Sequence, residues 1–307
     1  MHARSEPYTI MAHIAASTAT QLTAGAVALL RAASPTAAAA LDGADRPFQT
    51  SGHAQQRGWN PRRRTGKPTL LVNGCGRSGT HAMAALLRRH GIRALHEGRG
   101  HDATIGWPYT GHLVGSWYEL WPMNNQPRSS DLYDPIFKVH RHPLAAISSI
   151  AAGLTSSGQC RNPSERRWDA RAWRCATSFV PLPISSERIV NQTTCFIGGS
   201  GRLKLALHYW VMWNLLGDRW ATHTFAIENV TVAEVAHHWC AHCSTANGCV
   251  CPVAAREVLG NFSSERVRAR RGHGRKRSVL TWQGLADVDA NLTAVAKSMA
   301  VAYGYST

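Results

Sequence analysis

The chain has 307 residues and a formal net charge of +16, from 34 Lys and Arg against 18 Asp and Glu. Hydrophobic residues make up 44% and charged residues 17%, which excludes a wholly disordered chain. The absence of a strongly apolar, uncharged run of about 18 residues excludes a polytopic membrane protein. The length allows one large domain or two small ones. The excess of positive charge predicts an anionic partner, such as a phosphorylated nucleotide, a nucleic acid or an acidic glycan.

Residues 1–66 differ in composition from the rest of the chain. No Lys, Arg, Asp or Glu occurs between Tyr8 and Leu30, and Ala, Ser and Thr dominate the stretch from Ala15 to Ala40. Such a segment is typical of a signal or signal-anchor segment, of an organelle transit peptide, or of a disordered leader. A signal-anchor would attach the protein to a membrane. We therefore expect a leader and polar linker over 1–66 and a folded domain over 67–307.

A glycine-rich loop between a strand and a helix predicts an anion site. The apolar run from Thr69 to Val72 predicts a buried strand, and residues 81–90 contain good helix formers with apolar Met83, Leu86 and Leu87. Glycines let successive backbone N–H groups converge, and the helix N-terminus adds partial positive charge. We expect a phosphate-like group above the loop residues Gly76, Arg77, Ser78, Gly79 and Thr80.

This loop lacks the residues that hydrolysis of ATP requires. Gly74 and Gly79 have the spacing of the G-x-x-x-x-G-K-[ST] loop. However, Thr80 stands at the lysine position and His81 at the position of the metal-binding hydroxyl. The cation lies within the loop instead, at Arg77.

A second strand–helix junction follows. Residues 135–140 predict a strand, and residues 144–150 a helix with Pro143 in its first turn. Arg141 ends the strand, and Ser149 lies eight residues later on the helix. An arginine offers planar, bidentate donors to phosphate oxygens, and a serine adds a hydroxyl.

Together, the run from Gly76 to Thr80 after a strand and the Arg141–Ser149 pair resemble the signatures of sulfotransferases that use PAPS (3′-phosphoadenosine 5′-phosphosulfate), especially the Golgi carbohydrate type. The resemblance implies an α/β, P-loop-like three-layer fold with a central, mostly parallel sheet flanked by helices. It implies that the loop through His81 binds the 5′-phosphosulfate of PAPS and that Arg141 and Ser149 hold the 3′-phosphate. No metal is expected in this reaction.

Sulfonyl transfer to a hydroxyl needs a base. By its position near the end of the strand predicted over 93–98, Glu97 matches the base of the resembled family, and His96 and His101 are alternatives. His96 and Glu97 would point to opposite faces of a strand. The resemblance also implies that Arg77 stabilises the charge that develops on the leaving phosphate.

The function expected from this resemblance is in-line sulfonate transfer from PAPS to a hydroxyl acceptor, with an acidic glycan as the expected acceptor. One alternative is a P-loop nucleotide kinase. Another is a non-enzymatic protein that binds nucleic acid or acidic glycans through the basic run 266–277, which holds seven Lys or Arg residues. No zinc-finger or RNA-binding pattern supports a specific nucleic-acid partner.

The remaining elements predicted are a dense apolar helix over 205–216, a late strand over 224–228 and a C-terminal amphipathic helix that ends near 302–305. Glu228, which ends that strand, is expected to have a structural role. Eleven tryptophans are expected mainly in the core.

The cysteines and the glycosylation sequons indicate the cellular compartment in which the protein is expected. Cys240, Cys243, Cys249 and Cys251 could bind zinc with His237, His238 and His242, but disulfides are favoured in a lumen. Cys75 is expected to be a free thiol, and Cys160, Cys175 and Cys195 lie in a separate region. Asn-x-Ser/Thr sequons begin at Asn191, Asn229, Asn261 and Asn291. We expect a glycoprotein of the Golgi or secretory pathway, with an organelle reached through a transit peptide as the alternative.

Overall fold

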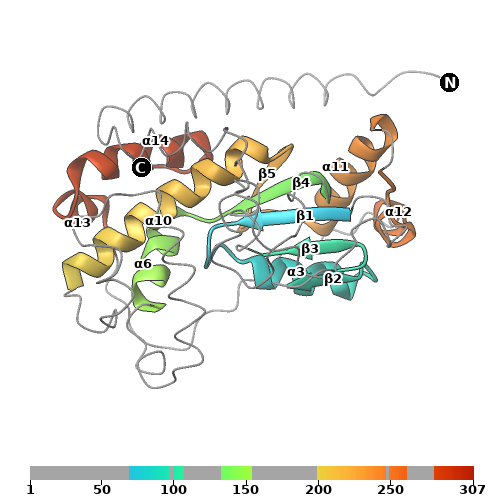
Figure 1. The fold of residues 1–307 in the computed structure, drawn as a ribbon, viewed down its shortest axis with the longest axis horizontal. Coiled ribbons are helices and arrows are strands. Elements are labelled where there is room, and N and C mark those ends of the chain that lie inside the picture. Colours follow the sequence, from blue (N-terminus) through green and yellow to red (C-terminus); the bar gives the residue numbers. More distant parts are fainter. Residues whose placement is uncertain (1–68, 97–99, 107–132, 154–198, 247–248, 261–279) are drawn as a thin grey trace, which may run out of the picture.

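The computed structural model describes residues 69–96, 100–106, 133–153, 199–246, 249–260 and 280–307. In these ranges the chain forms a central sheet with helices on both faces (Figure 1). The elements, in chain order, are β1 (Thr69–Gly74), α3 (Thr80–Arg89), β2 (Ala94–His96), β3 (Ala103–Ile105), β4 (Tyr133–His140), α6 (Pro143–Gly153), α10 (Gly199–Trp220), β5 (His223–Ala226), α11 (Val232–Thr245), α12 (Val253–Gly260), α13 (Trp282–Ala286) and α14 (Ala290–Ala302).

Within the described ranges, the sheet has five strands in the order β2-β3-β1-β4-β5, and each neighbouring pair is parallel. The central strand β1 is a short apolar run, and Leu70, Leu71 and Val72 are fully buried. A strand buried on both faces needs this composition because helices cover both sides of a parallel sheet. The α/β class with a parallel sheet is thus confirmed.

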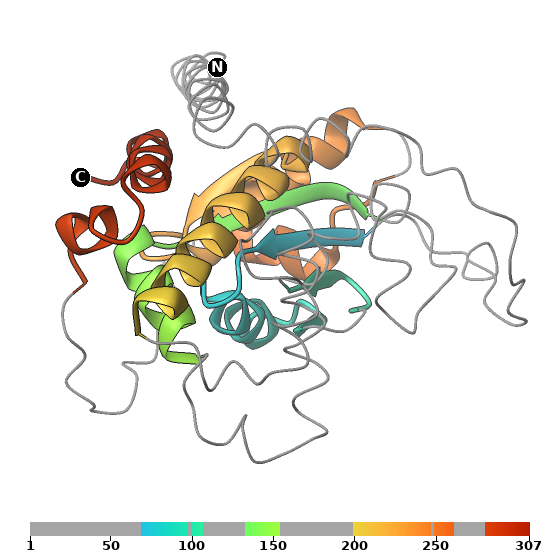
Figure 2. The same cartoon turned by 60° about the vertical axis from the view of Figure 1, so that its left-hand side comes forward.

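Two hydrophobic clusters form the core of the described residues. One joins strand residues to α3, α11 and α12, and Trp239 is among its fully buried side chains. The other joins α6, α10, α13 and α14 and contains the buried Trp210 and Trp213. Figure 2 shows α10 and α14 on one side of the sheet and α3 on the other. These three tryptophans lie in the core, as expected.

Most predicted elements are present, with adjusted limits. The strands predicted over 69–72 and 135–140 are the longer β1 and β4, and the helix predicted over 205–216 is the longer α10. The late strand is shorter than predicted, because β5 ends at Ala226 and leaves Glu228 in the following turn. Proline opens α6, and Gly91 has a φ of +77° just after α3, as their positions predicted.

Four of the described elements were not predicted, namely β3, α11, α12 and the short helix α13. The strand β3 has only three residues, too few to show a period. Helices α11 and α12 lie in a region whose many Cys and His residues suggested disulfides or a zinc site, and no helix was predicted there. A helix signal was nevertheless present in α11, since Thr231 accepts a hydrogen bond from the backbone N of Glu234 as an N-cap. The buried Val232, Val235 and Trp239 also follow helical spacing.

Some predictions fall outside the described ranges. They include the leader and linker over 1–66, the basic run 266–277, Glu97, and the sequons at Asn191 and Asn261. These remain predictions. No helix in the described part of the chain is both long and apolar enough to cross a membrane.

Candidate functional site: two strand–helix junctions

The predicted binding motifs lie where the winding of the sheet reverses. From β1 the chain moves to β2 and β3 on one side of the sheet, whereas β4 and β5 lie on the other. Gly74 at the end of β1 is paired with Val139 near the end of β4. In open parallel sheets, ligands bind beyond the carboxyl ends of the strands at such a reversal. The loop after β1 and the segment after β4 both leave the sheet at this point.

The loop after β1 is tight because its glycines have no side chains. Gly79 has a φ of +90°, and a Cβ there would lie 2.6 Å from Cγ1 of Ile227. A Cβ on Gly76 would lie 2.8 Å from the Tyr209 hydroxyl, which accepts a hydrogen bond of 3.0 Å from the Gly76 backbone N. Arg77 also lies in the left-handed region, with a φ of +70°. The loop thus holds a strained backbone that larger residues would disrupt.

Arg77 and Ser149 bring the two motifs into direct contact. The Arg77 Nε donates a 3.0 Å hydrogen bond to the Ser149 Oγ on α6. Ser149 is buried, whereas Arg77 is exposed. Within the described ranges, no carboxylate pairs with Arg77. An arginine without an acidic partner, next to a buried hydroxyl, is suited to bind an anion.

Arg141 directly follows β4 and is half-buried. The segment around it is fixed by Glu228, which accepts hydrogen bonds from the backbone N of His142 at 2.9 Å and from the Tyr305 hydroxyl at 2.8 Å. Burial, together with the Glu228 carboxylate, raises the pKa of Tyr305. Glu228 therefore has a positioning role, and it ties the C-terminus to the junction that carries Arg141.

His96, at the end of β2, faces the start of α3. Its Nε2 lies 3.1 Å from the Thr80 hydroxyl, and its ring meets the edge of the His81 ring with centroids 5.2 Å apart. Burial lowers the pKa of His96 to about 4, and the charges of His81 and Arg88 act in the same direction. The imidazole is therefore neutral at neutral pH and lies next to the loop.

The structure places the other alternative base at the opposite edge of the sheet. His101 precedes β3 and lies 2.8 Å from the Asp102 carboxylate, which also binds Arg93. Because all strand pairs are parallel, the start of β3 lies at the amino edge, away from the loop. His101 is therefore not brought to the site. Glu97 lies outside the described residues.

A buried lysine beneath the site was missed by sequence reasoning. Lys138 on β4 is fully buried and donates to the Asn214 carbonyl at 3.1 Å and to the Tyr303 hydroxyl at 2.6 Å. It also pairs with Asp218. Burial lowers the pKa of Lys138, while Asp218 opposes that shift. The available signal was a lysine between the apolar Phe137 and Val139 of a buried strand. The contacts join β4, α10 and the C-terminus below the loop.

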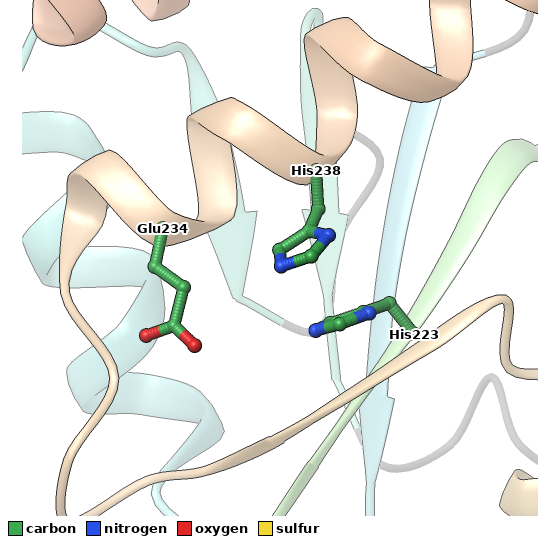
Figure 3. A group of neighbouring side chains, drawn as sticks. All are labelled: His223, Glu234 and His238. Carbon is green, nitrogen blue, oxygen red and sulfur yellow. The ribbon is translucent and has the colours of Figure 1, made fainter. Parts of the chain in front are cut away.

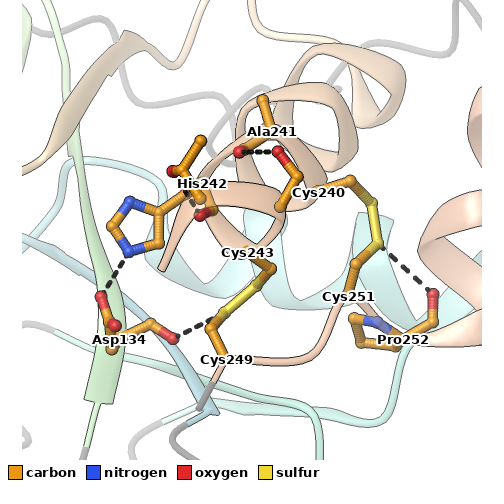
Figure 4. The surroundings of a disulfide bond; sticks show 10 residues. Asp134, Cys240, Ala241, His242, Cys243, Cys249, Cys251 and Pro252 are labelled. Carbon is orange, nitrogen blue, oxygen red and sulfur yellow. Dashed lines mark hydrogen bonds and ion pairs between the residues drawn. A yellow bond between two sulfur atoms is a disulfide. The ribbon is translucent and has the colours of Figure 1, made fainter. Parts of the chain in front are cut away.

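The cysteines behave largely as expected. Cys240 pairs with Cys251 and Cys243 with Cys249, which links α11 to the segment just before α12 (Figure 4). The disulfide interpretation is thus confirmed over zinc ligation for these four. Cys75 is a buried free thiol, and burial raises its pKa. Two disulfides are compatible with a secreted or lumenal protein.

Comparison of the chain with models of known protein families, with curated proteins and with solved structures finds no match.

Proposed function

We propose that this protein is a PAPS-dependent sulfotransferase that transfers a sulfonate group to a hydroxyl on an acidic glycan. The observation that carries the proposal is the hydrogen bond between Arg77 and Ser149. It joins the loop after β1 to the helix after β4 at the reversal of the sheet, where a doubly phosphorylated nucleotide would need both motifs. The P-loop kinase alternative is less favoured because Thr80 and His81 replace its lysine and metal-binding hydroxyl.

In the proposed reaction, an acceptor hydroxyl oxygen attacks the sulfur of PAPS. The bond between that sulfur and the bridging phosphate oxygen breaks in line, and a base takes the proton of the hydroxyl. Negative charge then develops on the 5′-phosphate, where Arg77 and the loop N–H groups stabilise it. Arg141 and Ser149 hold the 3′-phosphate of the nucleotide. No covalent intermediate on the enzyme and no metal are required.

The proposal leaves two candidates for the base, Glu97 and His96. The position of His96 beside Thr80 and its neutral ring support it as a proton acceptor. Because its pKa is about 4, it is unprotonated throughout the neutral range. If His96 is the base, the rate should fall on the acidic side only as the pH approaches 4.

Replacing His96 by Gln separates the two candidates. If His96 is the base, the turnover of the H96Q variant should fall by about 100-fold or more, with little change in the affinity for PAP, the desulfonated product. The matched E97Q variant should then retain most of its activity. The opposite pattern would assign the proton transfer to Glu97.

Transfer of a radiolabel tests the activity itself. The full-length protein is incubated with PAPS that carries a labelled sulfonate and with a mixture of acidic and neutral glycans. The proposal predicts labelled glycan without added metal, and loss of labelling in an R77A variant. Label transferred instead from γ-labelled ATP with Mg²⁺ would support the kinase. Salt-dependent binding of DNA or glycan with no response to nucleotide would support the non-enzymatic alternative.

We further propose that the protein acts in the Golgi lumen as a glycoprotein, attached through its N-terminal segment. The two disulfides support this location, as do the exposed positions of Asn229 and Asn291 in their sequons. Expression in a eukaryotic host followed by glycosidase digestion tests it. Digestion should reduce the apparent mass, and N229Q and N291Q variants should each remove part of that shift. An unglycosylated protein within another organelle would support the transit-peptide alternative.

A further inference from the structure

Three metal-ligating side chains converge where α11 lies against the edge strand β5. They are His223, Glu234 and His238, whose ligand atoms lie within 4.8 Å of one another. Figure 3 shows Glu234 and His238 extending from α11 toward His223. Glu234 and His238 are four residues apart and therefore share one face of the helix. His223 is the first residue of β5.

The two imidazoles lie close together and beside an aromatic ring. Their rings stack with centroids 3.5 Å apart, and Phe225 lies 4.5 Å from His223 and 5.8 Å from His238 between ring centroids. Both imidazoles are partly buried. Within the described residues, none of the three side chains has a hydrogen bond or ion pair that would occupy its ligand atoms.

We propose that His223, Glu234 and His238 bind one divalent transition-metal ion, of which Zn²⁺ is the best match. Two imidazole nitrogens and one carboxylate oxygen form a ligand set that suits Zn²⁺, whereas Mg²⁺ and Ca²⁺ prefer oxygen ligands alone. Bonds of about 2 Å to a common ion require the three groups to approach more closely than 4.8 Å. Binding one ion also requires the two imidazole rings to leave their stacked arrangement, so that one nitrogen of each ring points at the ion. Glu234 is exposed, so water can supply a fourth ligand.

The ion would connect an edge strand to the helix that covers it. Among the strands that the structure describes, β5 is the last in the sheet order and pairs with β4 alone. A bridge from His223 to α11 would therefore stabilise an element that is supported on one side only. This metal site shares no residue with the proposed PAPS site, so its test is independent of the sulfotransferase proposal.

The test is a Zn²⁺ titration of the full-length, tag-free protein, first stripped of metal and kept oxidised so that its disulfides stay closed. Zn²⁺ competes against a chromophoric chelator, and Co²⁺ serves as a spectroscopic probe. We expect one Zn²⁺ per chain, a rise in Tm, and visible Co²⁺ absorption typical of a four-coordinate site. The H223Q and H238Q variants should each bind at least about tenfold more weakly.

The neighbouring exposed His237 provides a matched control, and H237Q should bind Zn²⁺ like the unmodified chain. Mg²⁺ and Ca²⁺ should not displace the bound ion. Circular dichroism in the absence of metal confirms that the variants fold, and the Co²⁺ spectrum of the unmodified chain depends on no variant. Two results would overturn the site: no stoichiometric Zn²⁺ binding by the unmodified chain, or binding of Zn²⁺ by H223Q and H238Q with the same affinity as the unmodified chain.

Discussion

At the scale of single residues, the loop after β1 depends on backbone conformations and spaces that few side chains tolerate. Gly79 and Gly304 both have positive φ values, +90° and +80°. Their surroundings differ, because a Cβ on Gly79 would meet Ile227 at 2.6 Å, whereas a Cβ on Gly304 would meet nothing within 4 Å. Comparing an alanine substitution at each position therefore distinguishes the cost of backbone strain from the cost of steric overlap.

We predict that G304A lowers the free energy of unfolding by about 1 kcal/mol, from backbone strain alone. G79A should cost about 2–4 kcal/mol, because overpacking against Ile227 adds to the same strain. It should also weaken binding of PAP. Urea denaturation of both variants measures the difference. Equal losses would show that the contact with Ile227 does not constrain the loop.

The residues of the site were predictable to different degrees. The loop motif and the Arg141–Ser149 spacing were visible because they depend on neighbours in the sequence. The contact between Arg77 and Ser149 spans 72 positions, so no local pattern could reveal it. The cluster of Lys138, Asp218 and Tyr303 was missed for the same reason, since it joins three distant segments.

At the scale of elements, the hydroxyls of two tyrosines connect the C-terminus to the sheet, and their surroundings differ. The Tyr303 hydroxyl contacts Asp218 and the fully buried Lys138. The Tyr305 hydroxyl contacts Glu228 and His140 in a more exposed setting. An unsatisfied buried charge costs more than an exposed one, so the first contact should contribute more to stability.

We therefore predict that Y303F lowers the free energy of unfolding by about 1–3 kcal/mol, and Y305F by less. Thermal or urea unfolding of both variants measures the effect. The comparison is matched because each substitution removes a single hydroxyl. A larger loss in Y305F would contradict the role assigned to the Lys138 cluster.

Elements with a strong hydrophobic period could be predicted from the sequence, whereas short or compositionally unusual ones could not. β1, β4 and α10 each contain an apolar stretch that the sequence shows directly, so tertiary packing only adjusted their ends. β3 has three residues and owes its existence to pairing with β1 and β2. In α11, the cysteines and histidines obscured a valid helix signal, because those residue types suggest metal or disulfide chemistry before they suggest a helix.

At the scale of the whole molecule, neutral buried histidines should make the fold sensitive to acid. Burial lowers the pKa of His96 and His208 to about 4, whereas an unfolded histidine titrates near about 6.5. Between these values the unfolded chain binds more protons than the folded chain, so stability rises with pH. The stabilisation is fully present above about pH 6.5 and is lost as the pH falls toward 4.

His208 provides the test, because it lies outside the candidate site, 3.8 Å from Asp289. Between pH 7 and pH 5, the unmodified chain should lose more stability than an H208Q variant, by about 1 kcal/mol. Urea midpoints at the two pH values measure this difference. Parallel losses in the two proteins would mean that His208 is not held neutral in the folded state.

The central claim is that two strand–helix junctions together bind the two phosphates of one nucleotide. Calorimetric titration of the full-length protein with PAP and with AMP, which lacks the 3′-phosphate, tests it most directly. PAP should bind at least about tenfold more tightly than AMP. This advantage should disappear in an R141A variant, whereas R77A should weaken both ligands. Equal affinities for PAP and AMP in the unmodified chain, or tighter binding of ATP with Mg²⁺ than of either, would contradict the claim.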